Sequence, residues 1–153
     1  MCIRDRTIAA ITITVLAGTT LALAAPATKD DAVAMVKKAV AAIKVDGTEK
    51  AYAAISTLGG QFVDGEIYTV VSNFDGVTVA HATNSKLIGK NMMEAQDVDG
   101  KFFAKDMTAL ARKQASFWYD YKFVNPVTKK IQVKDFYCEV LSSTRVCAGV
   151  YRP

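Results

Sequence analysis

Apolar residues between positions 29 and 55 recur at helical spacing. In the segment 29–44, lysines occupy one side and apolar residues the other: Val33, Val36, Val40 and Ile43. This pattern predicts an amphipathic helix, with Thr28 as a candidate N-cap and Asp31 three residues later. A break at 45–47 precedes a second predicted helix, which starts at Thr48 and ends before 59–60.

From residue 66 the apolar pattern changes to a period of two. Residues 66–83, EIYTVVSNFDGVTVAHAT, predict two strands joined at Asp75-Gly76, a strong hairpin signal. With these two residues as the loop, the predicted register pairs Val70 with His81, Ser72 with Val79, and Phe74 with Val77. Both faces of this hairpin are largely apolar, so we expect both to be covered.

The rest of the chain predicts one helix and three strands. A single helical turn is expected in 84–91, and a loop leading into a helix in 97–114. Strands follow at 117–123, Ile131–Leu141 and Arg145–Tyr151. Helices that lie before and between consecutive antiparallel strands predict an α+β domain.

The strand at 117–123, FWYDYKF, carries five aromatic rings. Alternation puts two sets on opposite faces, namely Phe117, Tyr119, Tyr121 and Phe123 against Trp118, Asp120 and Lys122. We expect the first set to pack under the N-terminal helix. The second set mixes a ring with two charges, which are unfavourable to bury without partners. It fits the wall of an amphipathic cavity near His81, or alternatively a solvated sheet edge with an exposed tryptophan.

The first 27 residues differ in composition from the rest. Two arginines precede an uncharged run from Thr7 to Thr28, which has small residues at 22–24 and 25–27. A basic start, an apolar centre and an A-x-A end predict a secretory signal peptide over 1–27. The alternative is an uncleaved membrane anchor, for which the threonines of this run are poorly suited. After cleavage, 28–153 would be one periplasmic or secreted domain without a membrane span.

The charge of the chain is moderate and dispersed. Its net charge is +4, no four basic residues are consecutive, and 51% of the 153 residues are hydrophobic. Dispersed charge argues against nucleic acid or an anionic membrane as the main partner. The hydrophobic content suits a single domain with a core.

Two cysteines, Cys138 and Cys147, remain in the expected exported domain. They flank EVLSSTRV, which predicts a hairpin whose two-residue loop is Ser142-Ser143. In that register the two cysteines face each other, close enough for a disulfide. The alternative is a pair of independent buried thiols, but an oxidising compartment favours the bridge.

Residues for common catalytic and cofactor sites are missing. His81 is the single histidine, and on an apolar strand it is either a hydrogen-bonded core residue or a ligand contact. There is no His/Cys cluster for zinc, haem-attachment motif, nucleophile elbow or phosphate-binding glycine loop. The loop 95–106 resembles a calcium loop in part, but alanine holds its first position and aspartate its last. We expect no metal, no cofactor and no enzymatic activity.

Several ordered motifs resemble the single Cache domains (type 2) of bacterial extracytoplasmic sensors. They are FVDGEIYTVVSNFDGVTVAHATNSKLIGKN, DVDGKFFAKDM, FWYDYKFVNPVTKK and CAGVYRP, and the similarity runs from about Val33 to Arg152. The resemblance implies a PAS-like fold in which a long N-terminal helix packs on a five-stranded antiparallel sheet. It also implies a small-molecule pocket on the other side of the sheet, closed by the segment between the second and third strands.

Members of this family sense small metabolites, often short carboxylates, in chemoreceptors and histidine kinases. Carried over to this sequence, the ligand site would comprise Tyr68, Phe74, His81, Trp118, Tyr121 and Tyr137, with Lys101 and Lys122 as candidate partners for an anion. Sensor members continue into a second membrane helix and a signalling domain, whereas this sequence stops at Pro153. We therefore expect a free-standing periplasmic binding protein that acts through a separate membrane receptor or kinase.

Two other classes of function compete with sensory ligand binding. A secreted enzyme would need a general acid/base constellation, for which one histidine and scattered carboxylates give little support. A structural or adaptor module of the same fold would have lost its pocket to side chains. A pocket at Trp118 and His81 would argue against that module.

Overall fold

The N-terminal helix begins at a capping box. The computed structural model describes residues 25–153, so the predicted signal peptide lies outside the described residues except for 25–27. In α1 (Lys29–Asp46), the Asp31 N–H donates to Thr28 Oγ1 and the Thr28 N–H to Asp31 Oδ2. The helix ends at Gly47, whose φ of 82° glycine adopts readily. The second predicted helix follows as α2 (Thr48–Ile55), so both helices and the predicted cap are confirmed.

The buried face of α1 is not centred on the row of valines from which the helix was predicted. Ala32, Val36 and Ala39 are fully buried, whereas Val33 and Val40 are half-buried. Alanine side chains allow the helix to approach the sheet closely, and they therefore lie at the centre of the contact.

Five antiparallel strands form the main sheet, in the order β4-β3-β7-β6-β5. Their bounds are β3 (Val70–Asn73), β4 (Thr78–His81), β5 (Ser116–Val124), β6 (Ile131–Leu141) and β7 (Thr144–Tyr151). A separate two-stranded ribbon, which the sequence pattern did not predict, pairs β1 (Val63–Asp64) with β2 (Ile67–Tyr68). The expected α+β fold with a five-stranded antiparallel sheet is confirmed.

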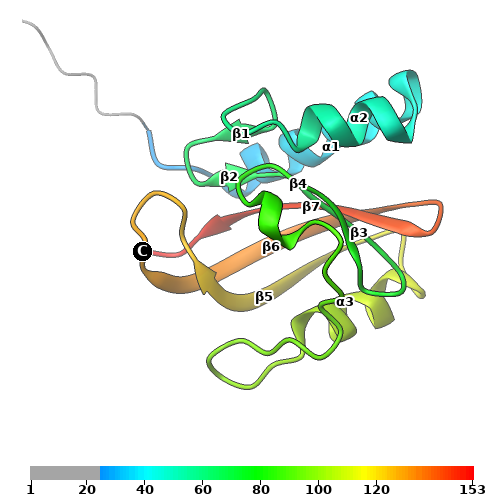
Figure 1. Cartoon of the computed structure of the whole chain (residues 1–153). Coiled ribbons are helices and arrows are strands. Elements are labelled where there is room, and N and C mark those ends of the chain that lie inside the picture. The colour runs from blue at the N-terminus through cyan, green and yellow to red at the C-terminus, as the bar shows by residue number, and fades with distance from the viewer. Residues whose placement is uncertain (1–24) are drawn as a thin grey trace, which may run out of the picture.

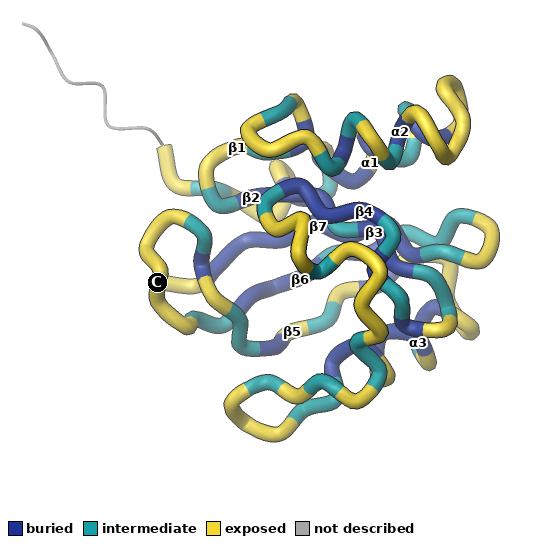
Figure 2. Tube along the Cα trace, in the orientation of Figure 1, coloured by how far each residue is buried: buried dark blue, intermediate teal, exposed yellow. Residues whose placement is uncertain are grey.

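Helices cover both faces of the sheet (Figure 1). Helices α1 and α2 lie on one face, and α3 (Phe103–Ala111) lies on the other. The short 3-10 turn η1 (Ser85–Leu87) opens the segment that leads from β4 to α3. Figure 2 shows buried strands between two more exposed layers. The hydrophobic residues accordingly form two cores, one between α1, α2 and the sheet and one between α3, β5 and β6.

The β3–β4 hairpin differs from its predicted register at one point. Val70 lies opposite His81 as expected, but the register shifts between Val71 and Ser72, so that Ser72 pairs with Thr78 and not with Val79. A β-bulge of this kind inserts an extra residue in one strand and changes which side chains share a face. Thr78 consequently joins His81 on the α3 side of the sheet.

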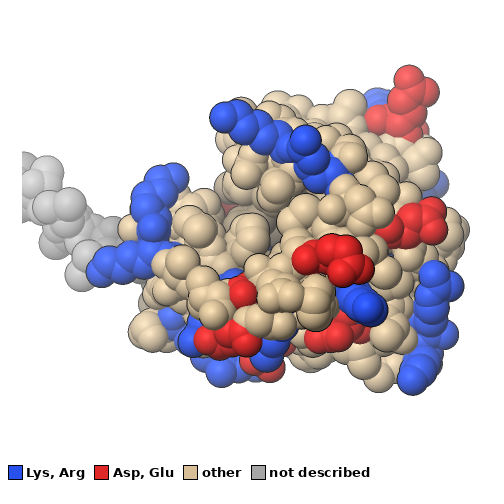
Figure 3. All heavy atoms as spheres, turned by 60° about the horizontal axis from the view of Figure 1, so that its bottom comes forward, with Lys and Arg blue, Asp and Glu red and all other residues tan. Residues whose placement is uncertain are grey.

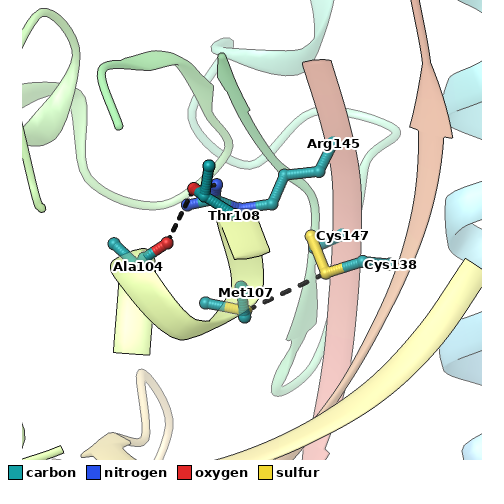
Figure 4. Close-up of a disulfide and its surroundings, with 6 residues drawn as sticks. All are labelled: Ala104, Met107, Thr108, Cys138, Arg145 and Cys147. Carbon is teal, nitrogen blue, oxygen red and sulfur yellow. Dashed lines mark hydrogen bonds between the residues drawn. A yellow bond between two sulfur atoms is a disulfide. The ribbon is translucent and has the colours of Figure 1, made fainter. Parts of the chain in front are cut away.

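The predicted disulfide is confirmed in the hairpin of β6 and β7. Cys138 lies directly opposite Cys147, their Cα atoms are 4.1 Å apart, and the two sulfurs are bonded. The bridge is buried against α3, where Cys138 Sγ lies 4.0 Å from Met107 Sδ (Figure 4). It therefore fixes the middle of the hairpin underneath this helix.

Within residues 25–153, no helix is long and apolar enough to cross a membrane. Basic and acidic side chains are intermixed on the face of the molecule that Figure 3 presents. The dispersed charge of the sequence thus remains dispersed on this face of the folded domain.

Candidate ligand-binding site

A cavity lies between the sheet and the layer that contains α3. The centre of a water molecule can occupy about 40 Å³ of its interior. This space holds roughly three or four waters, or a ligand of similar size. Its walls are Tyr68, Val70, Ser72, Thr78, His81, Leu87, Met92, Phe103, Ala104, Met107, Tyr121, Phe123, Phe136, Arg145 and Cys147. The pocket that the family resemblance implied on this side of the sheet is present.

The two walls of the cavity differ in chemistry. The segment from η1 to α3 contributes apolar side chains, among them Leu87, Met92 and Phe103. The sheet contributes polar groups, namely Ser72, Thr78, His81, Tyr121 and Arg145. Within the part of the chain that the structure describes, neither aspartate nor glutamate lines the cavity. A ligand that accepts hydrogen bonds at one end and is apolar at the other fits this arrangement.

Arg145 provides a buried positive charge. Its side chain is 3% exposed and runs from β7 towards α3, where Nη1 donates to the hydroxyl of Thr108 (Figure 4). Burial lowers the pKa of Arg145 to about 10, which leaves the guanidinium charged at neutral pH. No carboxylate of residues 25–153 lies within ion-pair distance of it. Most of its N–H donors therefore remain available to a ligand.

His81 is held as a neutral hydrogen-bond donor. Its Nδ1 accepts the backbone N–H groups of Thr83 and Asn84, at 3.3 and 3.1 Å. This places the ring proton on Nε2. Burial, assisted by the positive charge of Lys134, lowers the pKa of His81 to about 4. The turn after β4 thus fixes the tautomer, and Nε2–H is the polar group that His81 can offer to the cavity.

Two tyrosines line the cavity in different ways. The Tyr68 ring stacks on His81 with centroids 5.3 Å apart, and its hydroxyl lies 3.1 Å from that of Tyr151, which donates to Val124 O. Burial raises the pKa of Tyr68 to about 12. Tyr121 is also buried, and its hydroxyl has no hydrogen-bond partner among the described residues. Tyr68 is therefore held in place by its neighbours, whereas the Tyr121 hydroxyl can bond to a ligand.

Lys134 lies just behind the cavity wall. It is 0% exposed, and its Nζ finds no hydrogen-bond partner in residues 25–153. Three rings surround Nζ, with centroids 3.7 Å away for Tyr68, 4.4 Å for Phe136 and 5.1 Å for Tyr151. Burial holds the pKa of Lys134 well below its ordinary range, although the charge of Glu66 opposes this shift. Tyr68 and Phe136 belong both to this cage and to the cavity wall.

The structure places some of the predicted site residues at the cavity and others elsewhere. Tyr68, His81 and Tyr121 line the cavity. Phe74 does not; it packs at the margin of the α3-side core, where the Arg112 guanidinium lies 5.3 Å from its ring centroid.

The aromatic strand has the two predicted sets of side chains on opposite faces, but the layer expected to cover each face was wrong, and Trp118 follows the alternative of an exposed tryptophan. Phe117 and Tyr121 pack against α3, not under α1. Trp118 is 40% exposed on the α1 side, 5.1 Å from the ring of Tyr137 and 5.0 Å from Lys29 Nζ. Alternation determines which residues share a face, but not which layer covers that face. Because α3 precedes β5 by only a short connection, it folds back onto the ring-bearing face.

The two predicted anion partners, Lys101 and Lys122, lie outside the cavity. Lys101 Nζ pairs with Asp120 at 3.1 Å and Lys122 Nζ with Asp99 at 3.0 Å, and these ion pairs are largely exposed. They join the loop before α3 to the outer edge of β5. Asp97 of the same loop accepts the backbone N–H of Lys122, which satisfies a donor at this sheet edge.

Sequence reasoning missed Arg145, Lys134, Ser72 and Thr78. A signal for Arg145 was present, because it lies two residues before Cys147 on β7 and must share the face of the disulfide. Lys134 and Cys138 are an even number of positions apart on β6, so alternation puts Lys134 on that face as well. Thr78 had no such signal, because the bulge in β3–β4 reverses its expected side.

Comparisons with known proteins agree with this geometry. A family model described as Single Cache domain 2 matches residues 12–143. No curated protein matches the sequence. A methyl-accepting chemotaxis protein from Vibrio parahaemolyticus has a similar fold, with 21% identity, a TM-score of 0.67 and coverage of 80% of this chain and 87% of its own.

Two further solved structures share the fold. One is a Cache chemosensory domain whose published description concerns carboxylic acid recognition; it is 19% identical, with a TM-score of 0.63 and coverage of 81% of this chain and 88% of its own. The other is the periplasmic sensor domain of a chemotaxis protein, 20% identical, with a TM-score of 0.62 and coverage of 81% and 90%.

Proposed function

Because the chain belongs to the Single Cache domain 2 family of sensory ligand-binding domains, we propose that its cavity binds a short carboxylate. The observation that carries this proposal is the buried guanidinium of Arg145, which lines the cavity and has no carboxylate partner in residues 25–153. A buried charge is unfavourable unless it is paired, and a ligand carboxylate would supply the pair.

The other walls support a ligand of this kind. Nε2–H of His81 and the Tyr121 hydroxyl are further donors for carboxylate oxygens, and Phe103 and Met107 offer apolar contacts for a short carbon chain. The cavity has room for roughly three or four waters, which suits a small acid rather than a long-chain one. The fold neighbour described for carboxylic acid recognition is consistent with this choice.

We test the proposal by isothermal titration calorimetry and thermal unfolding with acetate, propionate, lactate and pyruvate. Acetamide and propionamide are matched neutral ligands. We expect at least one acid to bind and its amide not to bind, because only the acid pairs with Arg145. A ligand at 100 times its dissociation constant stabilises the fold by about 2.7 kcal/mol. For a domain of this size this is a rise of several degrees in Tm.

A matched pair of variants identifies the anion partner. Arg145→Met should abolish binding, whereas Arg112→Met, at the exposed end of α3, should retain it. Circular dichroism shows whether each variant is folded. If none of the acids changes the Tm of the wild-type domain, the carboxylate proposal fails, and an adaptor module with an unused cavity becomes the better explanation.

The cellular role proposed here follows from the family. We propose that the domain works outside the cytoplasm and that its ligand state is passed to a membrane receptor or kinase. Fold neighbours that are described as chemotaxis proteins support this proposal. Co-purification of this protein with a membrane receptor or kinase from its native cell, dependent on the bound acid, is the direct test.

A further inference from the structure

We propose that Lys134 takes up a proton from solvent when a carboxylate enters the cavity, so that the site binds the acid anion and a proton together. This inference rests on the carboxylate function proposed above. It concerns the regulation of that site, because it makes the apparent affinity depend on pH through a residue that does not touch the ligand.

The amine of Lys134 is fully buried in a cage of aromatic rings. Lys134 Nζ has no hydrogen-bond partner in residues 25–153 and is surrounded by the rings of Tyr68, Phe136 and Tyr151. Ring faces stabilise a cation, so the cage accepts the protonated form, but three rings alone do not replace its lost hydration. Burial without a polar partner therefore disfavours the charged form, and a negative charge placed nearby would favour it.

One acidic side chain acts on the charge of Lys134. Glu66, from the turn between β1 and β2, is the acid that favours the protonated amine. Both oxygens of its carboxylate are already engaged, one by Tyr151 N–H at 3.1 Å and the other by Asn125 Nδ2 at 2.9 Å. The other titratable groups around the amine are the phenols Tyr68, Tyr121 and Tyr151, and His81. None of them supplies a negative charge at neutral pH.

The rings of Tyr68 and Phe136 belong both to the cage around Nζ and to the cavity wall. Nζ lies 3.7 Å from the Tyr68 ring centroid. A carboxylate in van der Waals contact with the opposite face of that ring, about 3.5 Å further on, would lie roughly 7 Å from Nζ. At an effective dielectric constant of about 20, that charge favours protonation of the amine by about fifty-fold. By reciprocity, the domain with a protonated Lys134 binds the acid more tightly than the domain with a neutral Lys134, by the same factor.

Other groups at the cavity do not titrate in the same range. Burial lowers the pKa of His81 to about 4, and its Nδ1 is occupied by two backbone N–H donors. Burial also lowers the pKa of Arg145, to about 10. Between pH 6 and pH 9, Lys134 is thus the group of this site whose charge is expected to respond to the ligand.

The experiment is calorimetric titration of the whole exported domain with propionate, in buffers of different ionisation enthalpy, from pH 6 to pH 9. We expect uptake of up to about one proton per ligand and a dissociation constant that rises with pH by at most about fifty-fold. Lys134→Met, whose apolar chain fits the ring cage, should bind without proton uptake and without this pH dependence. Lys130→Met, at an exposed lysine, is the matched control and should behave as the wild type.

A second measurement does not require that the Lys134→Met variant binds propionate. The NMR signal of the Lys134 ε-carbon, identified by its absence in Lys134→Met, should move towards the position of a charged lysine when propionate is added at pH 8. Propionate binding with no proton uptake and no movement of this signal would overturn the inference and leave the proposed function intact. Uptake that persists in Lys134→Met would also overturn it. If propionate and the other acids do not bind at all, both proposals fail.

Discussion

At the scale of single residues, the cavity face of the sheet is defined by polar groups that the fold buries without acidic partners. Arg145 and Lys134 are 3% and 0% exposed, and neither has an ion-pair partner in the described part of the chain. The Tyr121 hydroxyl is unpaired among the same residues. Burying charged and hydroxyl groups without partners is unfavourable for folding, and such groups are more typical of a binding site than of a core.

Lys134 gives a residue-scale prediction about stability and pH. Burial holds the pKa of its amine below that of an unfolded lysine, so at pH 7 to 9.5 the unfolded chain binds more protons than the folded one. The free energy of unfolding of the wild type should therefore rise with pH over this range relative to that of Lys134→Met. At pH 7 the variant should be the more stable by about 1–3 kcal/mol, because it buries no amine. Urea unfolding at each pH measures both quantities.

This pH window avoids the other shifted groups. His81 affects stability below about pH 6.5, where the unfolded imidazole begins to bind a proton, and Tyr68 and Tyr121 act above about pH 10. A Lys134→Met variant whose stability ran parallel to that of the wild type from pH 7 to 9.5 would show that the amine stays charged in the folded state.

At the scale of elements, the hairpin of β6 and β7 carries the two buried basic side chains of this site and the disulfide. Lys134 and Phe136 come from β6, Arg145 and Cys147 from β7, and the disulfide joins the two strands beneath Met107 of α3. Strict alternation along the two strands puts all of these side chains on the α3 face. The hairpin is therefore the element whose register most directly determines the binding site.

The disulfide should stabilise this hairpin measurably. Replacing both cysteines, as in Cys138→Ala with Cys147→Ala, is expected to decrease the free energy of unfolding by ~2–3 kcal/mol, because the bridge closes a short loop. Reductant should lower the urea midpoint of the wild type and leave that of the double variant unchanged. Alkylation of the native exported protein without reductant should label neither cysteine, and labelling of both would contradict the bridge.

At the scale of the whole molecule, the layers on the two faces of the sheet have different roles. Helices α1 and α2 lie on one face of the sheet and bury it in a continuous apolar core, and α3 lies on the other face (Figure 1). Side chains of the segment from η1 to α3 line the cavity on that second face. That segment has little regular structure and is held to β5 through exposed ion pairs. It is therefore the layer that can adjust to a ligand with the least loss of packing.

The whole-molecule prediction concerns export. Protein recovered from a bacterial periplasm should begin between Ala25 and Thr28, because cleavage after small residues there leaves Thr28 to cap α1. Intact-mass measurement of the periplasmic fraction determines the first residue. A chain without 1–24 should remain in the cytoplasm as the control. Protein found in the membrane fraction with 1–24 attached would contradict cleavage.

Local patterns in the sequence were enough to determine the elements and several of their details. The capping box at Thr28, the hairpin at Asp75-Gly76 and the facing cysteines were all predicted because each depends on residues close in sequence or on simple alternation. The alternating pattern also predicted five strands, and the family resemblance supplied their arrangement in one sheet and the side of the sheet that carries the pocket.

Only the tertiary structure decided which side chains meet at that pocket. Alternation correctly put Trp118 on the opposite face of β5 from the other four rings. Which layer covers each face depends on how α1 and α3 pack against the sheet, and this packing places Trp118 away from the cavity. The bulge at Val71 turned Thr78 inward. Alternation from the two cysteines gives the face on which Arg145 and Lys134 lie, but not their burial, because burial of a charge depends on contacts between distant segments that no local pattern records.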